Sequence, residues 1–528
     1  MDGGTRARVL IAGAGVAGLE AALALSRLAP ELADVELLDP AEEFLYRPLL
    51  VAEPFGVESV IRFPLAKLAE QAGARLRPDS LAEVRAAEKV VVTAAGEKVE
   101  YDALLVTPGG RPVDAVPGAI TFGGASTDGR FDEVLRRLGR PGWRRVAFVV
   151  PSAATWTIAA YELAFLTAAE RRDRGLADAE IALVSHEHEP LGAFGPEASE
   201  LVRRRAAEAD VELHLGAVAT GHSGETLSLA GGDVIEADRV VALPRLEVAE
   251  IPGLPHGPQG FLKTDVQMEL TGLGGVWAAG DATAFPVKQG GLAAQQADVA
   301  ARAIAVRAGA RLPMEAYRPV LRAELITGGA PEFLRSHRGG GDADSSHSTE
   351  PLWWPPEKLA ARYLGPLLAA ESAGISFGEL IDLDPPDDPV EADAQSVRAI
   401  ELLLAAADSD ARQGEWESAL ASLALAERLE LVLPPEYVAR RERWRRKLEP
   451  GSSPSPSAAA GRIDPTLIDA TAALDDLEHR IGRMRARERD IGSRMRRDLT
   501  HLDEGLDQLR ALSRETGVLP PERGRRSQ

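Results

Sequence analysis

Residues 7–39, ARVLIAGAGVAGLEAALALSRLAPELADVELLD, decide the fold of this chain. An apolar run at 9–12 leads into a glycine-rich turn, and an Ala/Leu-rich helical pattern follows the turn. A second apolar run at 35–38 ends in Asp39. The order of strand, glycine turn, helix, strand and acid predicts a dinucleotide-binding unit.

The glycines of this turn have separate tasks in such a unit. Gly13 permits the tight turn, Gly15 lets the backbone approach a pyrophosphate, and Gly18 lets the helix pack closely on the strand. The free N–H groups at the start of the helix would hold the phosphates. Asp39, about 20 residues further on, would accept a hydrogen bond from a ribose hydroxyl. The alternative interpretation is a helix whose glycines serve packing alone.

The composition narrows the class of protein. The length of 528 residues suggests about three domains. The formal net charge of −21 argues against a nucleic-acid partner and favours a cytoplasmic protein. The absence of cysteine excludes disulfides, thiolate metal sites, iron–sulfur clusters and redox-active dithiols. We expect no secretory signal and no membrane-spanning helix. The close pair His186 and His188 is interpreted as surface loop, so no metal site is expected.

A second α/β unit follows the first. An apolar strand pattern at 146–150 precedes a helical pattern from Ile158, and another strand pattern spans 180–185. The turn between the first strand and the helix, PSAATWT at 151–157, has no glycine and is about four residues longer than a usual nucleotide-binding turn. Side chains therefore stand where a pyrophosphate needs bare backbone. Glu187, after the later strand, could still contact a ribose.

Four further segments are informative because of their order along the chain. They are FLYRPLL at 44–50, YDALLVTPGG at 101–110, VWAAGD at 276–281 and VKQGGLAAQQADVAA at 287–301. With GAGVAG at the N-terminus, they resemble the flavoproteins that have two dinucleotide-binding domains. The branch they resemble most is that of the sulfide:quinone oxidoreductases and type II NADH dehydrogenases. The resemblance covers about residues 6–325 and not the C-terminal part.

The resemblance and the later patterns together predict an α/β fold with two Rossmann-like dinucleotide-binding domains and an all-α C-terminal extension. The expected boundaries are an FAD-binding domain in two parts (1–129 and 255–327), a second dinucleotide-binding-like domain with a degenerate loop (130–254), a cap segment (328–380), a helical hairpin similar to a tetratricopeptide unit (391–449) and a coiled-coil-like helix (462–515).

The resemblance implies FAD as the cofactor. The implied cofactor-binding residues are Gly13, Gly15, Gly18, Asp39, Arg47, Val84, Thr107, Gly109, Gly280, Asp281, Lys288 and Gly290.

Some of these residues have roles that the resemblance implies. The Asp281 carboxylate would accept a hydrogen bond from the ribityl chain, and the main chain of Val84 would lie near the adenine. The helix that begins near 288–291 would direct its N-terminus at the flavin pyrimidine ring, where a reduced flavin carries negative charge. Lys288 and Gln289 are the catalytic candidates beside the ring. The alternative for Lys288 is a surface lysine that caps a loop.

The departures from the family pattern bear on the reaction. Sulfide oxidation in the resembling enzymes uses cysteines, and this chain has none, so that chemistry is excluded. Of the two glutamines that line the quinone pocket in type II NADH dehydrogenases, one matches Gln295 and the other falls on Gly291. NAD(P)H binding is doubtful because of the glycine-free loop. A remodelled nicotinamide site, another small-molecule donor and no second ligand all stay open.

The C-terminal third carries other expectations. The segment 353–370 either lies on a membrane surface or covers the flavin domain. The stretch 381–390 and the Ser/Pro-rich stretch 450–461 are expected to be linkers, and 337–350 a loop. The hairpin at 391–449 is either repeat-like or an ordinary helix pair. The last helix would mediate self-association or bind a partner helix, or it folds back on its own chain.

We therefore predict a FAD-dependent oxidoreductase that passes electrons from an unidentified small-molecule donor to an unidentified acceptor. One alternative is an enzyme like the type II NADH:quinone dehydrogenases. The other is a flavin-containing scaffold with structural FAD. The predicted location is the cytoplasm, with peripheral contact at the inner face of the membrane as an alternative.

Overall fold

In the computed structural model of the protein, the described residues are 6–372 except 58–59, 124–128, 338–344 and 354–357, then single positions between 404 and 423, and finally 435–448. These residues fall into two compact units, which are described separately. Of the described residues, those in 6–352 and 358–365 belong to the first unit, and 353 and those from 366 onward belong to the second.

The first unit begins with a parallel sheet in the strand order β20-β9-β1-β2-β5. The sequence motif forms β1 (Ala7–Ala12), α1 (Val16–Leu28) and β2 (Ala33–Leu38), as the glycine turn predicts. The chain leaves this sheet after β9 (Ala103–Val106) and returns much later with β20 (Val276–Ala278). β5 (Arg75–Arg77) forms the far edge beside β2.

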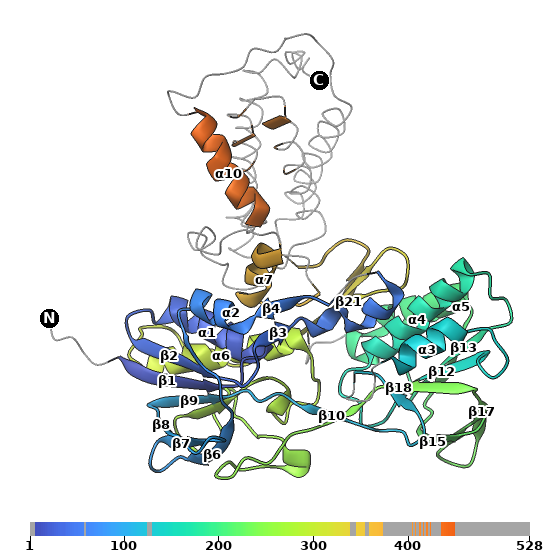
Figure 1. Ribbon diagram of the computed structural model, residues 1–528, viewed down its shortest axis with the longest axis horizontal. Coiled ribbons are helices and arrows are strands. Elements are labelled where there is room, and N and C mark those ends of the chain that lie inside the picture. Colours follow the sequence, from blue (N-terminus) through green and yellow to red (C-terminus); the bar gives the residue numbers. More distant parts are fainter. Residues whose placement is uncertain are drawn as a thin grey trace, which may run out of the picture. The chain divides into compact units, whose positions relative to one another are not determined.

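Helices α1 and α6 (Gly290–Arg307) pack together on this sheet (Figure 1). Their buried positions are mostly alanine and glycine, which allows the two backbones to approach closely. The antiparallel meander β6 (Leu81–Arg85), β7 (Val90–Thr93) and β8 (Lys98–Glu100) and helix α2 (Leu65–Gln71) complete this half.

A second parallel sheet has the order β11-β18-β12-β13-β14. It repeats the plan of the first sheet, and Figure 1 shows the two sheets at opposite ends of the unit. Its strands are β11 (Ile120–Thr121), β12 (Arg145–Val150), β13 (Glu180–Ser185), β14 (Val211–Leu215) and β18 (Arg239–Ala242). The helices of this half are α3 (Arg130–Arg137), α4 (Ile158–Asp173) and α5 (Pro196–Ala209). The two Rossmann-like halves expected from the sequence are thereby confirmed.

Several small elements join or flank the halves. The connecting chains pair as β10 (Arg111–Val113) with β19 (Arg245–Glu247). A meander of β15 (Ala219–Ser223), β16 (Thr226–Leu229) and β17 (Val234–Glu236) flanks the second sheet.

The sequence analysis missed one sheet. β21 (Val320–Leu325), β22 (Glu332–His337) and β23 (Ser345–Ser348) form an antiparallel sheet, and β23 lies within the stretch 337–350 that was expected to be a loop. The polar composition of 345–348 hides the strand, because its partner β22 rather than its own hydrophobicity holds it in place.

The segment 358–364 runs across the first unit and is held by buried polar groups. The fully buried Glu20 carboxylate of α1 accepts hydrogen bonds from the backbone N–H groups of Tyr363 (2.9 Å) and Leu364 (2.6 Å). The buried Glu162 carboxylate of α4 accepts from Lys358 Nζ at 2.7 Å. One carboxylate from each Rossmann-like half therefore anchors this segment.

Of the C-terminal expectations, little falls on described residues. Helix α7 (Leu364–Ser372) begins inside the segment 353–370, and α10 (Pro435–Leu448) lies inside the expected helical hairpin. The rest of that hairpin, both linkers and the coiled-coil-like helix at 462–515 lie outside the described residues. Within the part of the chain that is described, no helix is both long and apolar enough to cross a membrane.

Glu20 gives the fold a dependence on pH. Burial raises the pKa of Glu20 from 4.5 to about 7, against the lowering effect of its backbone hydrogen bonds. A carboxyl whose pKa is raised by folding contributes stability that is complete below the unfolded pKa and is lost as the pH rises through the folded pKa. The relevant window is therefore about pH 4.5 to 7.

We expect Glu20→Gln, which cannot titrate, to lose this dependence. From pH 4.5 to 7 the unfolding free energy of the wild type should fall relative to that of the variant, by on the order of 3 kcal/mol at most. Chemical denaturation at several pH values measures the difference, with Glu31→Gln as the control because the Glu31 side chain is 85% exposed. Parallel stability curves for the wild type and Glu20→Gln would contradict the assignment.

Candidate flavin site

The glycine turn is fixed by a third strand. Gly13 has a φ of +112°, and a Cβ built on it would lie 2.1 Å from the Thr107 carbonyl oxygen. The Thr107 hydroxyl donates a hydrogen bond to the Gly13 carbonyl at 2.7 Å, and its backbone N–H donates to Ala12 at 2.8 Å. A Cβ on Gly18 would lie 1.9 Å from the Gly13 carbonyl oxygen. Gly13, Gly18 and Thr107 therefore build the turn itself.

Gly15 differs from its two neighbours. It is the N-cap of α1, with extended backbone and no side-chain cap, and a Cβ built on it meets no protein atom within 4 Å. Nothing within the protein fold requires a glycine here. The space beside the first N–H groups of α1 is therefore open to a ligand, and an anion is the ligand that such a helix start favours.

Asp39 lies at the adjacent strand end and serves the turn as well. One carboxylate oxygen accepts from the Ala14 N–H at 2.7 Å and the other from the Ala41 N–H at 2.8 Å. Its own N–H donates to the Arg77 carbonyl at 3.1 Å. Asp39 is partly exposed, so each oxygen keeps a lone pair for a further donor.

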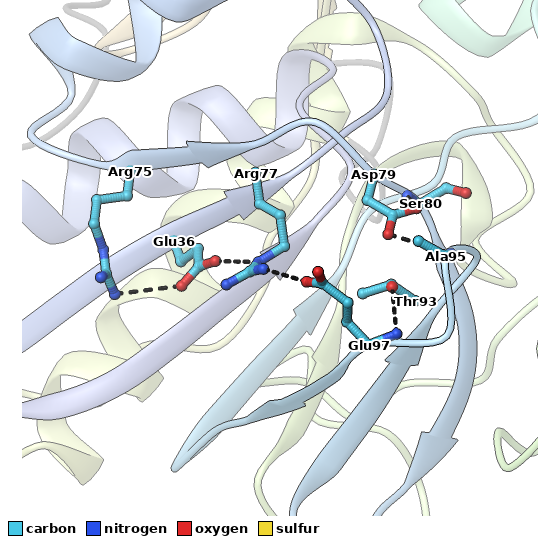
Figure 2. A network of polar contacts seen from close by, with 8 residues as sticks. All are labelled: Glu36, Arg75, Arg77, Asp79, Ser80, Thr93, Ala95 and Glu97. Carbon is cyan, nitrogen blue, oxygen red and sulfur yellow. Dashed lines mark hydrogen bonds and ion pairs between the residues drawn. The ribbon is translucent and has the colours of Figure 1, made fainter.

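A polar network secures the strand next to Asp39 (Figure 2). Arg77 on β5 forms ion pairs with Glu36 on β2 and with Glu97 in the β7–β8 turn. Asp79 accepts from the Ala95 N–H at 3.3 Å and thus ties the end of β5 to the same turn. These contacts set the position of the segment after β5 relative to the glycine turn.

Two further strand ends meet this turn. Ala12, Val106 and Ala278 are paired across β1, β9 and β20, so the residues that follow them share one edge of the sheet. A Cβ on Gly280, whose φ is +78°, would lie 3.3 Å from Ala17 Cβ on α1. The close approach of α1 and α6 at the carboxyl edge of the sheet therefore requires this glycine.

The Asp281 carboxylate stands at this edge without a hydrogen-bond or ion-pair partner among the described residues. It lies beside the turn that contains Gly109 and Gly110, because a Cβ on Gly110 would be 3.6 Å from Asp281 Cβ. Burial raises the pKa of Asp281, and the nearby cations of Lys288 and Arg47 oppose that rise. An unpaired carboxylate in such surroundings is stabilised by a donor that the protein itself does not provide.

Lys288 is buried rather than a surface residue. Its ammonium donates to the Thr283 carbonyl and lies 4.2 Å from the centroid of the Phe261 ring. Burial lowers the pKa of Lys288 to about 8, and the charge of Asp281 opposes the shift. Its backbone N–H donates to the Thr155 carbonyl at 3.1 Å, which joins this site to the glycine-free loop. The alternative of a surface lysine is therefore wrong.

Gln289 caps α6. Its side-chain oxygen accepts from the Leu292 N–H at 3.1 Å, and its amide nitrogen donates to the Arg322 carbonyl at 2.7 Å. The segment 358–364 touches the two glycines that follow, since a Cβ on Gly290 would be 2.7 Å from Leu359 Cδ1. Both polar groups of the Gln289 side chain are thus used within the fold, and its catalytic role stays a prediction.

Two other residues predicted to bind the cofactor, Val84 and Arg47, lie in contrasting surroundings. The Val84 N–H donates to the Pro252 carbonyl at 2.8 Å, and a Cβ on Gly253 would lie 1.8 Å from the Val84 carbonyl oxygen. The main chain of Val84 therefore already contacts the 252–253 turn, and its side chain lies in the core, which speaks against the expected adenine contact. Arg47 begins the short helix η1 (Arg47–Val51) and is exposed.

In the second half, the glycine-free loop and Glu187 contact side chains of the protein itself. Trp156 of the loop packs edge-on against Phe194 with ring centroids 5.9 Å apart. The Glu187 carboxylate accepts from Thr157 (3.1 Å), Tyr161 (2.8 Å) and Ser185 (3.0 Å). Glu187 stands where the acid of a nucleotide-binding unit would face a ribose, but three hydroxyls of the protein itself already bind it.

Sequence reasoning missed one supporting residue of the site, Gln296, and matched its neighbour Gln295 to a quinone-pocket glutamine. Gln296 is buried and accepts from the Gly280 N–H at 2.7 Å. Its neighbour Gln295 donates to the Val320 carbonyl and accepts from the Val320 N–H, both at 2.9 Å. The adjacent amides at 295–296 on an alanine-rich helix were the available signal, since buried amides need partners.

The comparisons with known proteins agree with this arrangement. The pyridine nucleotide-disulphide oxidoreductase family model matches residues 7–303. The chain belongs to this family of FAD-dependent oxidoreductases, so the protein is a flavin-dependent oxidoreductase with FAD as its cofactor. The family-level resemblance expected from the sequence is confirmed. A comparison with curated protein sequences gave no match.

Among solved structures, the sulfide:quinone oxidoreductase of Aquifex aeolicus is similar at 18% identity, with 74% of this chain and 99% of that chain covered and a TM-score of 0.60. This likeness concerns the fold. NDH2 of Plasmodium falciparum, solved with NADH, matches at 13% identity over 53% of this chain and 65% of that chain, with a TM-score of 0.44. A TM-score this low does not bear on function.

Within the described residues, no cluster of three or more His, Cys, Asp or Glu side chains could hold a metal ion.

The glycines allow a matched pair of substitutions. Gly15→Ala meets open space, so the unfolding free energy of the apoprotein should change by less than about 1 kcal/mol, while FAD retention falls. Gly18→Ala should lower that free energy by on the order of 3 kcal/mol or more, because its Cβ would overlap the Gly13 carbonyl. Thermal unfolding and flavin absorbance of the purified variants measure both effects. Equal destabilisation of the two apoproteins would show that Gly15 does not face a ligand.

Proposed function

We propose that FAD binds along the carboxyl edge of the first sheet, between the N-termini of α1 and α6. The observation that carries this proposal is the pairing of an open helix start at Gly15 with the unpaired carboxylate of Asp281. The start of α1 would hold the pyrophosphate, Asp39 a ribose hydroxyl and Asp281 the ribityl chain. Both ends of the site offer groups of the right charge and hydrogen-bonding type.

The start of α6 would lie at the pyrimidine side of the flavin. Bound FAD supplies the capacity to accept and release electrons. The residues of the chain supply the electrostatics: the helix N-terminus and the Lys288 ammonium together place positive charge at one end of the site. Such charge favours the reduced, negatively charged form of a flavin. Lys288 is thus our candidate for the residue that adjusts the redox potential.

We further propose that the electron donor does not use a conventional nicotinamide site. The hydroxyls of Thr157, Tyr161 and Ser185 surround Glu187, and Trp156 packs on Phe194. A ribose and a pyrophosphate would have to displace these contacts, which involve the buried side chains of Tyr161, Ser185 and Phe194. Displacing buried partners of a carboxylate without replacing every hydrogen bond is unfavourable.

A type II NADH:quinone dehydrogenase-like reaction receives less support from the contacts. The Gln295 amide that matches a quinone-pocket glutamine is engaged on both sides by Val320. The position of the second glutamine is Gly291, which lies against the segment 358–364. Both positions that match the quinone-pocket glutamines are therefore engaged within the fold, so this reaction is the less favoured one.

A scaffold with structural FAD, that is, a member of this family without electron transfer to a substrate, is the second candidate function. The three protein hydroxyls bound to Glu187 favour it. A catalytic flavin and a structural one would share every contact proposed above. They differ in whether a donor and an acceptor exchange electrons with the flavin at a useful rate.

The donor proposal is tested by anaerobic titration. NADH and then NADPH, added to the purified holoprotein, should leave the visible absorption of the flavin unchanged, whereas photoreduction in the same cuvette should bleach it. Rapid bleaching by either nucleotide would contradict the proposed closure of the second site. Fast reoxidation of the photoreduced flavin by a small-molecule acceptor would favour the enzyme over the scaffold.

The role of Lys288 is tested by the flavin reduction potential. Lys288→Met should lower the potential at pH 7 by about 30–60 mV, since 30 mV corresponds to about 1.4 kcal/mol for a two-electron couple. The exposed Lys263→Met serves as the control. Because the pKa of Lys288 is about 8, the difference from the wild type should shrink as the pH rises past 8. An unchanged potential at pH 7 would remove Lys288 from this role.

A further inference from the structure

The segment 358–364 contacts the start of α6, which lies at one end of the proposed flavin site. It is held at three places. The Leu359 N–H donates to the Tyr46 hydroxyl at 3.0 Å, the N–H groups of Tyr363 and Leu364 donate to Glu20, and Lys358 pairs with Glu162. These partners belong to α1, to α4 and to the residue before Arg47, so the segment is clamped from both Rossmann-like halves.

The pair of Lys358 and Glu162 is the buried part of this clamp. The two side chains are 11% and 2% exposed, and the distance from Nζ to Oε1 is 2.7 Å. Glu162 also accepts from the Ile326 N–H at 3.1 Å. Burial raises the pKa of Glu162, and the Lys358 charge opposes that rise. Removing one member leaves an uncompensated charge inside the protein, so the segment would detach there first.

Between its anchors the segment covers the start of α6. A Cβ built on Gly290 would be 2.7 Å from Leu359 Cδ1, and one on Gly291 would be 3.3 Å from the Ala360 carbonyl oxygen. Larger residues at 290 and 291 would therefore push the segment away. Leu359 and Ala360 are themselves buried, as is Gly291, so this contact reduces the access of water to the helix start.

We propose that Lys358 and Glu162 are positioning residues that hold Leu359 and Ala360 as a wall of the flavin pocket at the start of α6. The wall excludes solvent from the pyrimidine side of the flavin and limits which oxidants reach it. A dry environment also strengthens the effect of the helix start and of Lys288 on a reduced flavin. This inference rests on the proposed location of FAD.

The clamp is tested in the holoprotein by limited trypsin digestion. Glu162→Gln keeps both cleavable residues, Lys358 and Arg362, but leaves the Lys358 cation without its buried partner. Cleavage after these two residues, followed by mass spectrometry, should become about tenfold faster than in the wild type. Glu170→Gln, on the same helix but in a partly exposed pair with Arg174, is the matched control and should digest like the wild type.

The wall is tested separately with dioxygen as the probe. After photoreduction, reoxidation of the flavin by dissolved oxygen should be faster in Glu162→Gln and in Leu359→Ala than in the wild type. Leu359→Ala keeps the ion pair, so its cleavage after Lys358 and Arg362 should stay at the wild-type rate. The second variant therefore distinguishes loss of the wall side chain from loss of the clamp, and it remains informative if Glu162→Gln fails to fold.

The outcomes separate the two proposals. A wild-type protein that purifies without FAD and does not bind added FAD refutes the proposed function itself. Bound FAD whose reoxidation rate is unchanged in Leu359→Ala overturns the wall. Unchanged cleavage after Lys358 and Arg362 in a folded Glu162→Gln protein overturns the clamp. Faster cleavage together with faster reoxidation supports both parts of the inference.

Discussion

The contact between Gly13, Gly18 and Thr107 is the constraint on which the first half of the molecule depends. Three backbone segments meet within a distance that allows no Cβ at either glycine, and the Thr107 hydroxyl closes the turn by donating to the Gly13 carbonyl. The turn determines where α1 begins and which N–H groups face the open space at Gly15. Every proposed contact to the FAD phosphates follows from that geometry.

The two Rossmann-like halves both have a five-stranded sheet, and they differ in what the acid after the second strand of the motif binds. In the first half, the acid after the second strand binds backbone N–H groups of the glycine turn and stays partly exposed. In the second half, Glu187 binds three hydroxyls from the loop, the helix and the strand of its own unit. The second half therefore has hydroxyl-bearing and aromatic side chains, in contact with one another, at the point where the first half has its glycine turn.

Several buried charged side chains lie near the segment 358–364 and the start of α6. Glu20, Glu162, Lys288 and Lys358 are all largely buried, and each has its charge matched by N–H groups, a carbonyl or an opposite charge. Such groups are costly to bury without partners, so they fix the path of the chain at those points. The segment 358–364 is positioned by polar contacts as much as by its apolar side chains.

The sequence by itself determined the first Rossmann-like unit, the family and the absence of cysteine chemistry. These properties depend on local spacing, since Gly13, Gly15, Gly18 and Asp39 stand within one strand–helix–strand unit whose geometry is nearly invariant. Only the tertiary structure decided that Thr107 closes the turn, that Gln289 and Gln295 bind backbone groups, and that Lys288 is buried. Each of these depends on residues that are distant in the chain, such as Val320 beside Gln295. Hydrophobic periodicity shows which face of an element is buried, but it does not show which distant backbone group satisfies a buried polar side chain.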